Sequence, residues 1–136
     1  MAPKLFIVLC LIATVLLLRP QDVDAVEMVP IQLLVMNKIN NQAPQNYNAS
    51  AVMAGSLLGA MTRLKDSYSD FTFVGQENPD FGVFIESVNN VAGNFSDRTF
   101  WQILSNKSGT PAPTPVGVSC YFPEANEHII FNFTTF

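Results

Sequence analysis

The residues that could do chemistry are few and far apart in the chain. His128 is the only histidine. As a catalytic base it would need a nucleophile and an orienting acid, and as a metal ligand it would need companion ligands. The sequence around it supplies neither set. We therefore expect His128 to be a strand-edge residue that forms a local hydrogen bond, and we expect no metal site.

Other patterns that support catalysis or cofactor binding are also missing. Glu124 and Glu127 are close in sequence, as are Asp66 and Asp70, and we expect all four to be solvated surface charges. The seven glycines match neither the dinucleotide-binding spacing nor the phosphate-loop spacing. The sequence therefore predicts no catalytic residues and a protein that is not an enzyme.

One stretch, residues 80–101, has the character of a binding face. Gly82 stands among Phe81, Val83 and Phe84, which predicts a strand whose backbone another segment approaches closely. Trp101, the only tryptophan, precedes a loop rich in Ser, Gly and Pro that runs to residue 115. An apolar strand, an aromatic pair and an adaptable loop together favour a large, flat, partly apolar ligand.

The first 25 residues predict a secretory signal peptide. Lys4 supplies a positive charge, residues 5–18 are almost entirely apolar, and small residues near position 25 suit cleavage. The apolar run is shorter than the roughly 20 residues that span a bilayer, which disfavours the alternative of an uncleaved anchor. We therefore expect a secreted, extracellular protein whose residues 26–136 form a single domain without membrane attachment.

Net charge and cysteine content limit the classes of partner and the covalent links that the sequence can support. The chain has seven basic and eleven acidic residues, a formal net charge of −4, and no basic cluster, which argues against nucleic acid. Removal of the signal leaves Cys120 alone in an oxidising compartment. It is expected to be a buried small hydrophobe, with intermolecular pairing as the alternative. Four sequons predict glycosylation at Asn48, Asn94, Asn106 and Asn132.

The remaining pattern indicates one helix among several strands. Helical spacing of apolar residues after Ser56, a good N-cap, predicts an amphipathic helix over residues 56–66. Alternation and turn residues predict a loop or hairpin connection over 37–47 and a turn over 75–79. Strands are expected over 29–36, 49–53, 71–74, 82–88, 99–104, 116–122 and 128–133. This is an α+β arrangement with the helix packed on one face of a mixed sheet.

Several of these segments, in this order, resemble the C-terminal domain of the intrinsic factor and transcobalamin family of cobalamin carriers. The resemblance covers nearly all of residues 26–136. Its motifs include Phe81-Gly82-Val83-Phe84-Ile85, Ser87-Val88-Asn89-Asn90-Val91-Ala92, Thr99-Phe100-Trp101-Gln102-Ile103-Leu104-Ser105 and Asn126-Glu127-His128-Ile129.

The resemblance implies a ubiquitin-like β-grasp fold that caps cobalamin held mainly by a larger N-terminal helical barrel. The positions that match the family's cobalamin-contacting segments are Asp80, Phe81, Gly82, Val83, Phe84, Ile85, Trp101, Gln102, Ile103, Leu104 and Ser105. The expected partners are a corrinoid and either a separate helical-barrel protein or a cell-surface receptor.

Three departures from the family pattern leave two hypotheses open. The helical barrel is not in this sequence, the loop after Ser105 is longer than in the family, and Cys120 stands where the family does not ordinarily have cysteine. A glycan at Asn106 could block the ligand face. The first hypothesis is a secreted corrinoid-binding protein that contributes to vitamin binding or transport. The alternative is a secreted, non-enzymatic interaction or structural module that kept the fold and lost the ligand.

Overall fold

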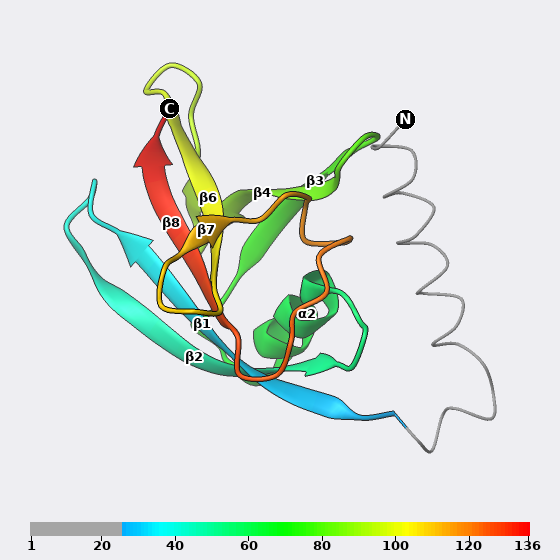
Figure 1. The fold of residues 1–136 in the computed structure, drawn as a ribbon. Coiled ribbons are helices and arrows are strands. Elements are labelled where there is room, and N and C mark those ends of the chain that lie inside the picture. The colour runs from blue at the N-terminus through cyan, green and yellow to red at the C-terminus, as the bar shows by residue number, and fades with distance from the viewer. Residues whose placement is uncertain (1–25) are drawn as a thin grey trace.

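The computed structural model describes residues 26–136, which fold into two sheets and one helix (Figure 1). The predicted signal peptide lies outside these residues. The described elements are β1 (Met28–Asn37), β2 (Gln42–Val52), α2 (Leu57–Ser67), β3 (Phe73–Asn78), β4 (Gly82–Val88), β5 (Val91–Ala92), β6 (Thr99–Asn106), β7 (Ala112–Pro113) and β8 (His128–Thr135). Within this part of the chain, no helix is long and apolar enough to cross a membrane.

The larger sheet has the strand order β2-β1-β8-β6-β7, and the smaller has the order β3-β4-β5. At the centre of the larger sheet, β1 and β8 run parallel, whereas every other neighbouring pair is antiparallel. The hairpin β1–β2, a following helix, and a late strand inserted beside β1 are the β-grasp arrangement. The predicted α+β fold, with one helix on a mixed sheet, is confirmed.

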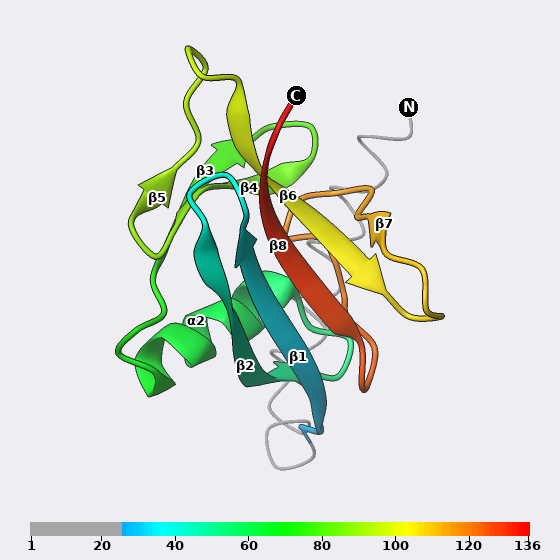
Figure 2. The ribbon, with the colours of Figure 1, turned by 90° about the vertical axis from the view of Figure 1, so that its left-hand side faces the viewer.

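Helix α2 forms where the apolar spacing predicts it. The Ser56 hydroxyl accepts a hydrogen bond from the Gly59 amide at 3.2 Å, which caps the first turn. The buried face consists of Leu57, Ala60, Met61 and Leu64, three or four residues apart. This face packs against the inner side of the larger sheet, and the outer side of that sheet faces the viewer in Figure 2.

The predicted hairpin connection exists, but it is shorter than residues 37–47, because β2 already begins at Gln42. A short turn closes the hairpin: the Asn37 side chain accepts a hydrogen bond from the Asn40 amide, and Asn41 has a φ of 52°. Pro44, which suggested a loop, lies within the strand. It is tolerated there because β2 is an edge strand and Pro44 lies at a register shift, where no residue of β1 is paired with it.

Two other predicted boundaries also shift. The strand expected over 71–74 and the turn over 75–79 are replaced by β3 with a register shift at Gly75, while Phe71 lies fully buried before the strand. Residues 116–122, expected as a strand, form turns instead. Their backbone groups form isolated hydrogen bonds to Phe81, to β4 and to the first turn of α2, and these bonds do not make a regular strand ladder. By contrast, β4 has the predicted bounds, and Asn89 and Asn90 form the expected turn with φ of 50° and 68°.

Candidate functional site

The tip of the β3–β4 hairpin exposes aromatic side chains. The Asn78 carboxamide oxygen accepts hydrogen bonds from the amides of Asp80 and Phe81, at 2.9 and 3.1 Å, and so fixes the turn. Phe81 and Phe84 are 49% and 45% exposed, and Asp80 is exposed beside them. Two exposed aromatic side chains at one hairpin tip, beside an exposed carboxylate, make this tip a candidate contact surface.

Gly82 follows this turn and has the close neighbour that its position in the sequence predicts. Its φ is +86°, and a Cβ placed there would lie 2.4 Å from the Ser119 Oγ. The neighbour belongs to residues 114–127, which we call the bridging segment. Its backbone runs alongside β4: the Gly117 amide donates to the Phe81 carbonyl, and the Val118 amide to the Val83 carbonyl, each at 2.8 Å.

The bridging segment also reaches β6 and α2. The Thr114 amide donates to the Ile103 carbonyl at 3.0 Å. The carbonyls of Val118 and Tyr121 accept from the first amides of α2, at 2.9 and 2.8 Å, and so satisfy donors that a helix N-terminus leaves unpaired. The bridging segment therefore connects the two stretches, 80–85 and 101–105, that the resemblance assigns to one ligand.

Trp101 occupies the core rather than a surface. It is 5% exposed, its indole Nε1 donates to the Val91 carbonyl at 2.7 Å, and its ring packs on Phe133 with centroids 5.0 Å apart. Ile85 is equally buried, and Val83 packs against the same core. In this conformation the side chains of Trp101, Ile85 and Val83 pack in or against the core and support the β3–β4 hairpin from its buried side.

The other residues of β6 alternate between the two faces of the larger sheet. Ile103 and Ser105 share the inner face with Trp101, and Ile103 packs against the core. Gln102 and Leu104 lie on the opposite face, where Gln102 accepts a long hydrogen bond of 3.4 Å from the Asn132 amide group. The structure therefore distributes the eleven assigned residues among the hairpin tip, the core and two faces of a sheet.

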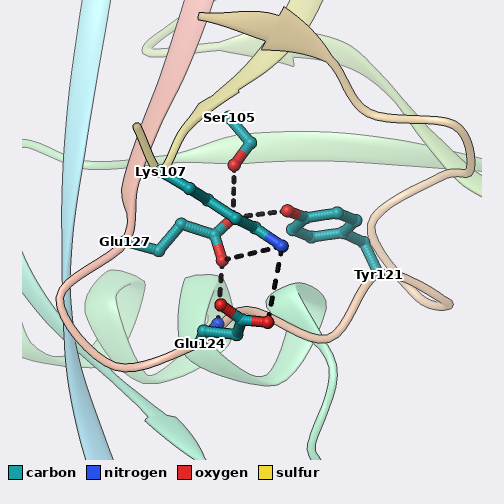
Figure 3. A network of polar contacts seen from close by, with 5 residues as sticks. All are labelled: Ser105, Lys107, Tyr121, Glu124 and Glu127. Carbon is teal, nitrogen blue, oxygen red and sulfur yellow. Dashed lines mark hydrogen bonds and ion pairs between the residues drawn. The ribbon is translucent and has the colours of Figure 1, made fainter. Parts of the chain in front are cut away.

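Ser105 belongs to a polar network centred on Glu127 (Figure 3). Glu127 is 2% exposed, and one carboxyl oxygen accepts from both the Ser105 hydroxyl, at 2.6 Å, and the Tyr121 hydroxyl. The other oxygen accepts from the Glu124 amide at 2.8 Å and lies 4.0 Å from the Lys107 Nζ. The expectation that Glu127 is a solvated surface charge is therefore wrong, whereas Glu124 is exposed.

Lys107 closes the network on its solvent side. Its Nζ lies 3.7 Å from a Glu124 carboxyl oxygen and 5.9 Å from the centroid of the Tyr121 ring. Burial lowers the pKa of Lys107, but attraction to Tyr121 and to both glutamates outweighs this, so the pKa is raised. Burial raises the pKa of Tyr121, and its hydrogen bond to Glu127 adds to the increase.

A pocket of about 350 Å³ opens beside this network. Its lining is rich in hydroxyl groups and proline, and includes Ser105, Lys107, Thr114, Pro115 and Tyr121. The volume is at the small end of the roughly 300–1,000 Å³ typical of small-molecule sites. It can therefore hold part of a large ligand. Sequence reasoning missed this pocket, although one of its lining residues, Ser105, belongs to the segment that the resemblance assigns to the ligand.

His128 does not behave as a strand-edge residue. It begins β8, a central strand, and its Nε2 is buried with no hydrogen-bond partner among residues 26–136. In the same part of the chain no group of three or more His, Cys, Asp or Glu side chains could hold a metal ion. Cys120 is free and half-buried, with its Sγ 3.8 Å from the Ser119 hydroxyl.

Comparison with known proteins finds similar sequences among cobalamin binding intrinsic factors. No protein-family model matches the chain. Cobalamin binding intrinsic factor of mouse is 34% identical over 111 residues, and that of rat 39% over 110 residues; each match covers 76% of this chain and 25% of the relative. The dog protein of the same name is 43% identical over 56 residues. The chain thus spans about a quarter of the length of the relatives that it matches most extensively.

Solved structures with the same fold have more distant sequences. Haptocorrin in complex with Cbi superimposes with a TM-score of 0.69 and 19% identity, covering 81% of this chain and 26% of that chain. A putative metal binding protein from Ruminococcus gnavus superimposes with a TM-score of 0.58 and 14% identity. Over 76% of its length this chain is therefore homologous to a part of cobalamin binding intrinsic factor, and it shares its α+β fold with a part of haptocorrin.

Proposed function

We propose that this chain is a secreted, non-catalytic protein that binds a corrinoid, with cobalamin as the ligand, and contributes to its binding or transport. The observation that carries the proposal is the homology to proteins named for cobalamin binding, at 34–39% identity over 110 or 111 residues. Identity at this level, over most of the described domain, supports conservation of the ligand class as well as the fold.

The hairpin tip supplies suitable chemistry for this ligand. A corrin is a broad ring with an apolar face and a rim of amides. Phe81 and Phe84 are half exposed and can cover apolar ring area, because aromatic side chains bury much surface with little loss of rotamer freedom. Backbone groups beside Gly82 and the hydroxyls around the Tyr121 pocket can pair with amides. In this proposal Ile85 and Trp101 hold the hairpin in place from the core.

The described domain by itself can bury only part of such a ligand. Its exposed aromatic residues stand at a hairpin tip, and the neighbouring pocket has about 350 Å³. Binding by one face leaves much of the ring in water, and the entropy lost on association is offset only in part. We therefore propose that a second protein, either a helical-barrel protein or a cell-surface receptor, covers the other side, and that simultaneous contact raises the effective concentration.

A second candidate function is an interaction module that no longer binds a corrinoid. The observation that favours it is the engagement of Trp101 with Val91 and Phe133, which withdraws the largest aromatic ring of the assigned set from any ligand. Under this alternative Phe81 and Phe84 would contact a protein partner directly.

Calorimetric titration of the secreted protein with hydroxocobalamin tests the proposal. We expect saturable heat with a Kd between about 1 μM and 1 mM, since a single face contributes part of a full site. Phe81→Ala and Phe84→Ala should each weaken binding about tenfold, equivalent to ~1.4 kcal/mol. Phe95→Ala is the matched control, because Phe95 is 87% exposed in the loop between β5 and β6. Absence of heat up to ~1 mM ligand would favour the interaction module.

A further inference from the structure

Strand β2 forms one edge of the larger sheet, and part of its backbone faces away from every other strand (Figure 1). The Met53 amide donates to the Glu27 carbonyl at 2.8 Å, so Met53 and every second residue before it bond toward β1. Asn48 and Ser50 lie between those residues and therefore direct their N–H and C=O groups away from β1. A row of such groups at a sheet edge is a template for one more strand.

Arg63 extends from α2 to this edge. Its Nε and Nη2 donate to the Ser50 carbonyl oxygen at 3.2 and 2.8 Å, as expected if this carbonyl points away from β1. These bonds leave Nη1 for another acceptor. Within residues 26–136 no carboxylate lies at ion-pair distance from the guanidinium. Burial lowers the pKa of Arg63, because the cation is partly removed from water.

A pocket of about 340 Å³ opens where Arg63 meets the edge of β2. Besides Arg63, its lining includes Met28 and Tyr68, which are 46% and 39% exposed. Arg, Met and Tyr are side chains that protein–protein interfaces enrich, and Tyr and Arg are frequent among the residues that contribute most binding energy. This pocket shares no lining residue with the Tyr121 pocket, and it includes no residue of the β3–β4 hairpin.

The two apolar side chains lie on opposite sides of the edge. Met28 precedes Val29, which packs against the core, so the Met28 side chain points to the face of the sheet away from α2. Tyr68 follows α2 and lies on the α2 side together with Arg63. A strand added at this edge would present alternate residues to the two sides.

We propose that this edge binds a protein partner by strand addition, and that the partner supplies an extended segment with an acidic residue among apolar ones. The backbone of the segment pairs with the outward groups of Asn48 and Ser50. Its carboxylate pairs with Arg63, and its apolar side chains cover Met28 and Tyr68. We call these five residues the edge site.

The charge of Arg63 identifies the acidic residue of the partner. Its acceptor at Ser50 is a neutral carbonyl, which leaves the positive charge uncompensated. A carboxylate compensates the charge and accepts two parallel hydrogen bonds from a guanidinium. The alternative is that Arg63 only shields the edge against other strands. The two possibilities differ in whether Arg63 contributes to the affinity for an acidic segment.

Selection from a random library of short linear peptides, against the full chain recovered from the medium of mammalian cells, tests the chemistry of the partner. We expect enriched peptides to carry an acidic residue flanked by apolar residues. An enriched peptide, synthesised with a fluorescent label, should bind with a Kd of about 1–100 μM in an anisotropy titration. Failure to enrich such peptides would overturn the proposal.

Substitution of Arg63 tests the ion pair. Arg63→Gln should weaken binding of the peptide about tenfold, and replacement of the peptide's acidic residue by its amide should do the same. The two changes together should cost no more than either alone, because both remove one interaction. Lys65→Gln is the matched control, since Lys65 is an exposed cation on the same helix, and it should leave the affinity within about twofold. Equal binding by the Arg63→Gln variant would show that Arg63 only shields the edge.

A backbone change tests the strand pairing. Ser50→Pro removes an N–H that points away from β1, so it should abolish peptide binding while the β1–β2 ladder remains. Ser50→Ala, which loses the same hydroxyl and the same sequon, should not weaken binding. N-methylation of alternate amides of the peptide tests the same bonds in the unchanged protein. Peptides that tolerate N-methylation at every position would contradict strand addition. None of these measurements requires a corrinoid, so their outcome is independent of the proposed ligand.

Discussion

Glu127 holds together three parts of the chain that are distant in sequence. Its buried carboxyl group accepts hydrogen bonds from Ser105 at the end of β6, from Tyr121 in the bridging segment and from the backbone of Glu124. Several donors depend on this one buried carboxyl group. If the acceptor is removed, each buried donor is left without a hydrogen bond, and the free energy of its desolvation is no longer offset. Glu127, which immediately precedes β8, therefore anchors the bridging segment that lines the pocket.

Glu127→Gln should destabilise the protein by about 1–3 kcal/mol, because an amide group would replace one of the two accepting oxygens. Urea unfolding measures the change in the free energy of unfolding. The matched control is Glu124→Gln, which removes only an exposed ion pair with Lys107 and should change stability by less than ~1 kcal/mol. Equal effects of the two substitutions would show that burial of Glu127 is energetically unimportant.

Among the parts of the fold, the bridging segment does the most to position the candidate site, although it is neither a strand nor a helix. It has no regular secondary structure after β7, yet it supplies partners to β4, β6 and the first turn of α2. Such close parallel passage of two backbones requires a small residue at the point of contact. A Cβ on Gly117 would lie 2.2 Å from the Val83 carbonyl oxygen, a backbone atom that cannot move aside.

Gly117→Ala should therefore destabilise the protein by more than about 2 kcal/mol and displace the bridging segment from β4. Chemical denaturation gives the free energy, and amide hydrogen exchange at Val118 reports the displacement. Gly59→Ala is the opposite case: a Cβ there meets nothing closer than 3.7 Å, and α2 should gain about 0.5–1 kcal/mol. A neutral Gly117→Ala would mean that β4 and the bridging segment separate at little cost.

At the scale of the whole molecule, Trp101 couples the two sheets. It lies in β6 of the larger sheet, donates to Val91 of β5 in the smaller sheet, and packs on Phe133 of β8. The two sheets share the buried core around it. A domain with one shared core is expected to unfold in one cooperative step.

Urea unfolding followed by Trp101 fluorescence and by far-ultraviolet circular dichroism should give coincident midpoints. Phe133→Leu should lower both midpoints together, with a loss of about 1–2 kcal/mol from reduced packing. A fluorescence change at lower urea than the dichroism change would show that the smaller sheet separates first.

How much the sequence predicts depends on whether the signal is local. The helix after Ser56, strand β4 and the Asn89-Asn90 turn were predictable, because capping, alternation and turn chemistry act within a few residues. The eleven site residues came from resemblance, and their assignment to a ligand remains a prediction. Their division between surface and core was not predictable, because exposure of Phe84 and burial of Trp101 depend on which strands become neighbours.

Long-range pairing explains the other misses. Pro44 suggested a loop, but it lies at an irregularity of β2, an edge strand that pairs with β1 on both sides of this position. Residues 116–122 have the composition of a strand, yet α2 and β4 take their backbone groups. Glu127 is buried because Ser105 and Tyr121 donate hydrogen bonds to it in the folded chain. No spacing pattern in the sequence predicts that these three residues come together.

The parallel pairing of β1 with β8 has a consequence for the order of events during synthesis. Gln32 lies beside His128, so the first and last strands of the described chain are neighbours at the centre of the larger sheet. The sheet cannot close until β8 has emerged from the ribosome, and contacts of such long sequence separation make folding slow. Until then β8 remains an extended chain. The pairing at the centre of the larger sheet therefore forms last, and the β1–β2 hairpin keeps one unpaired edge until β8 reaches it.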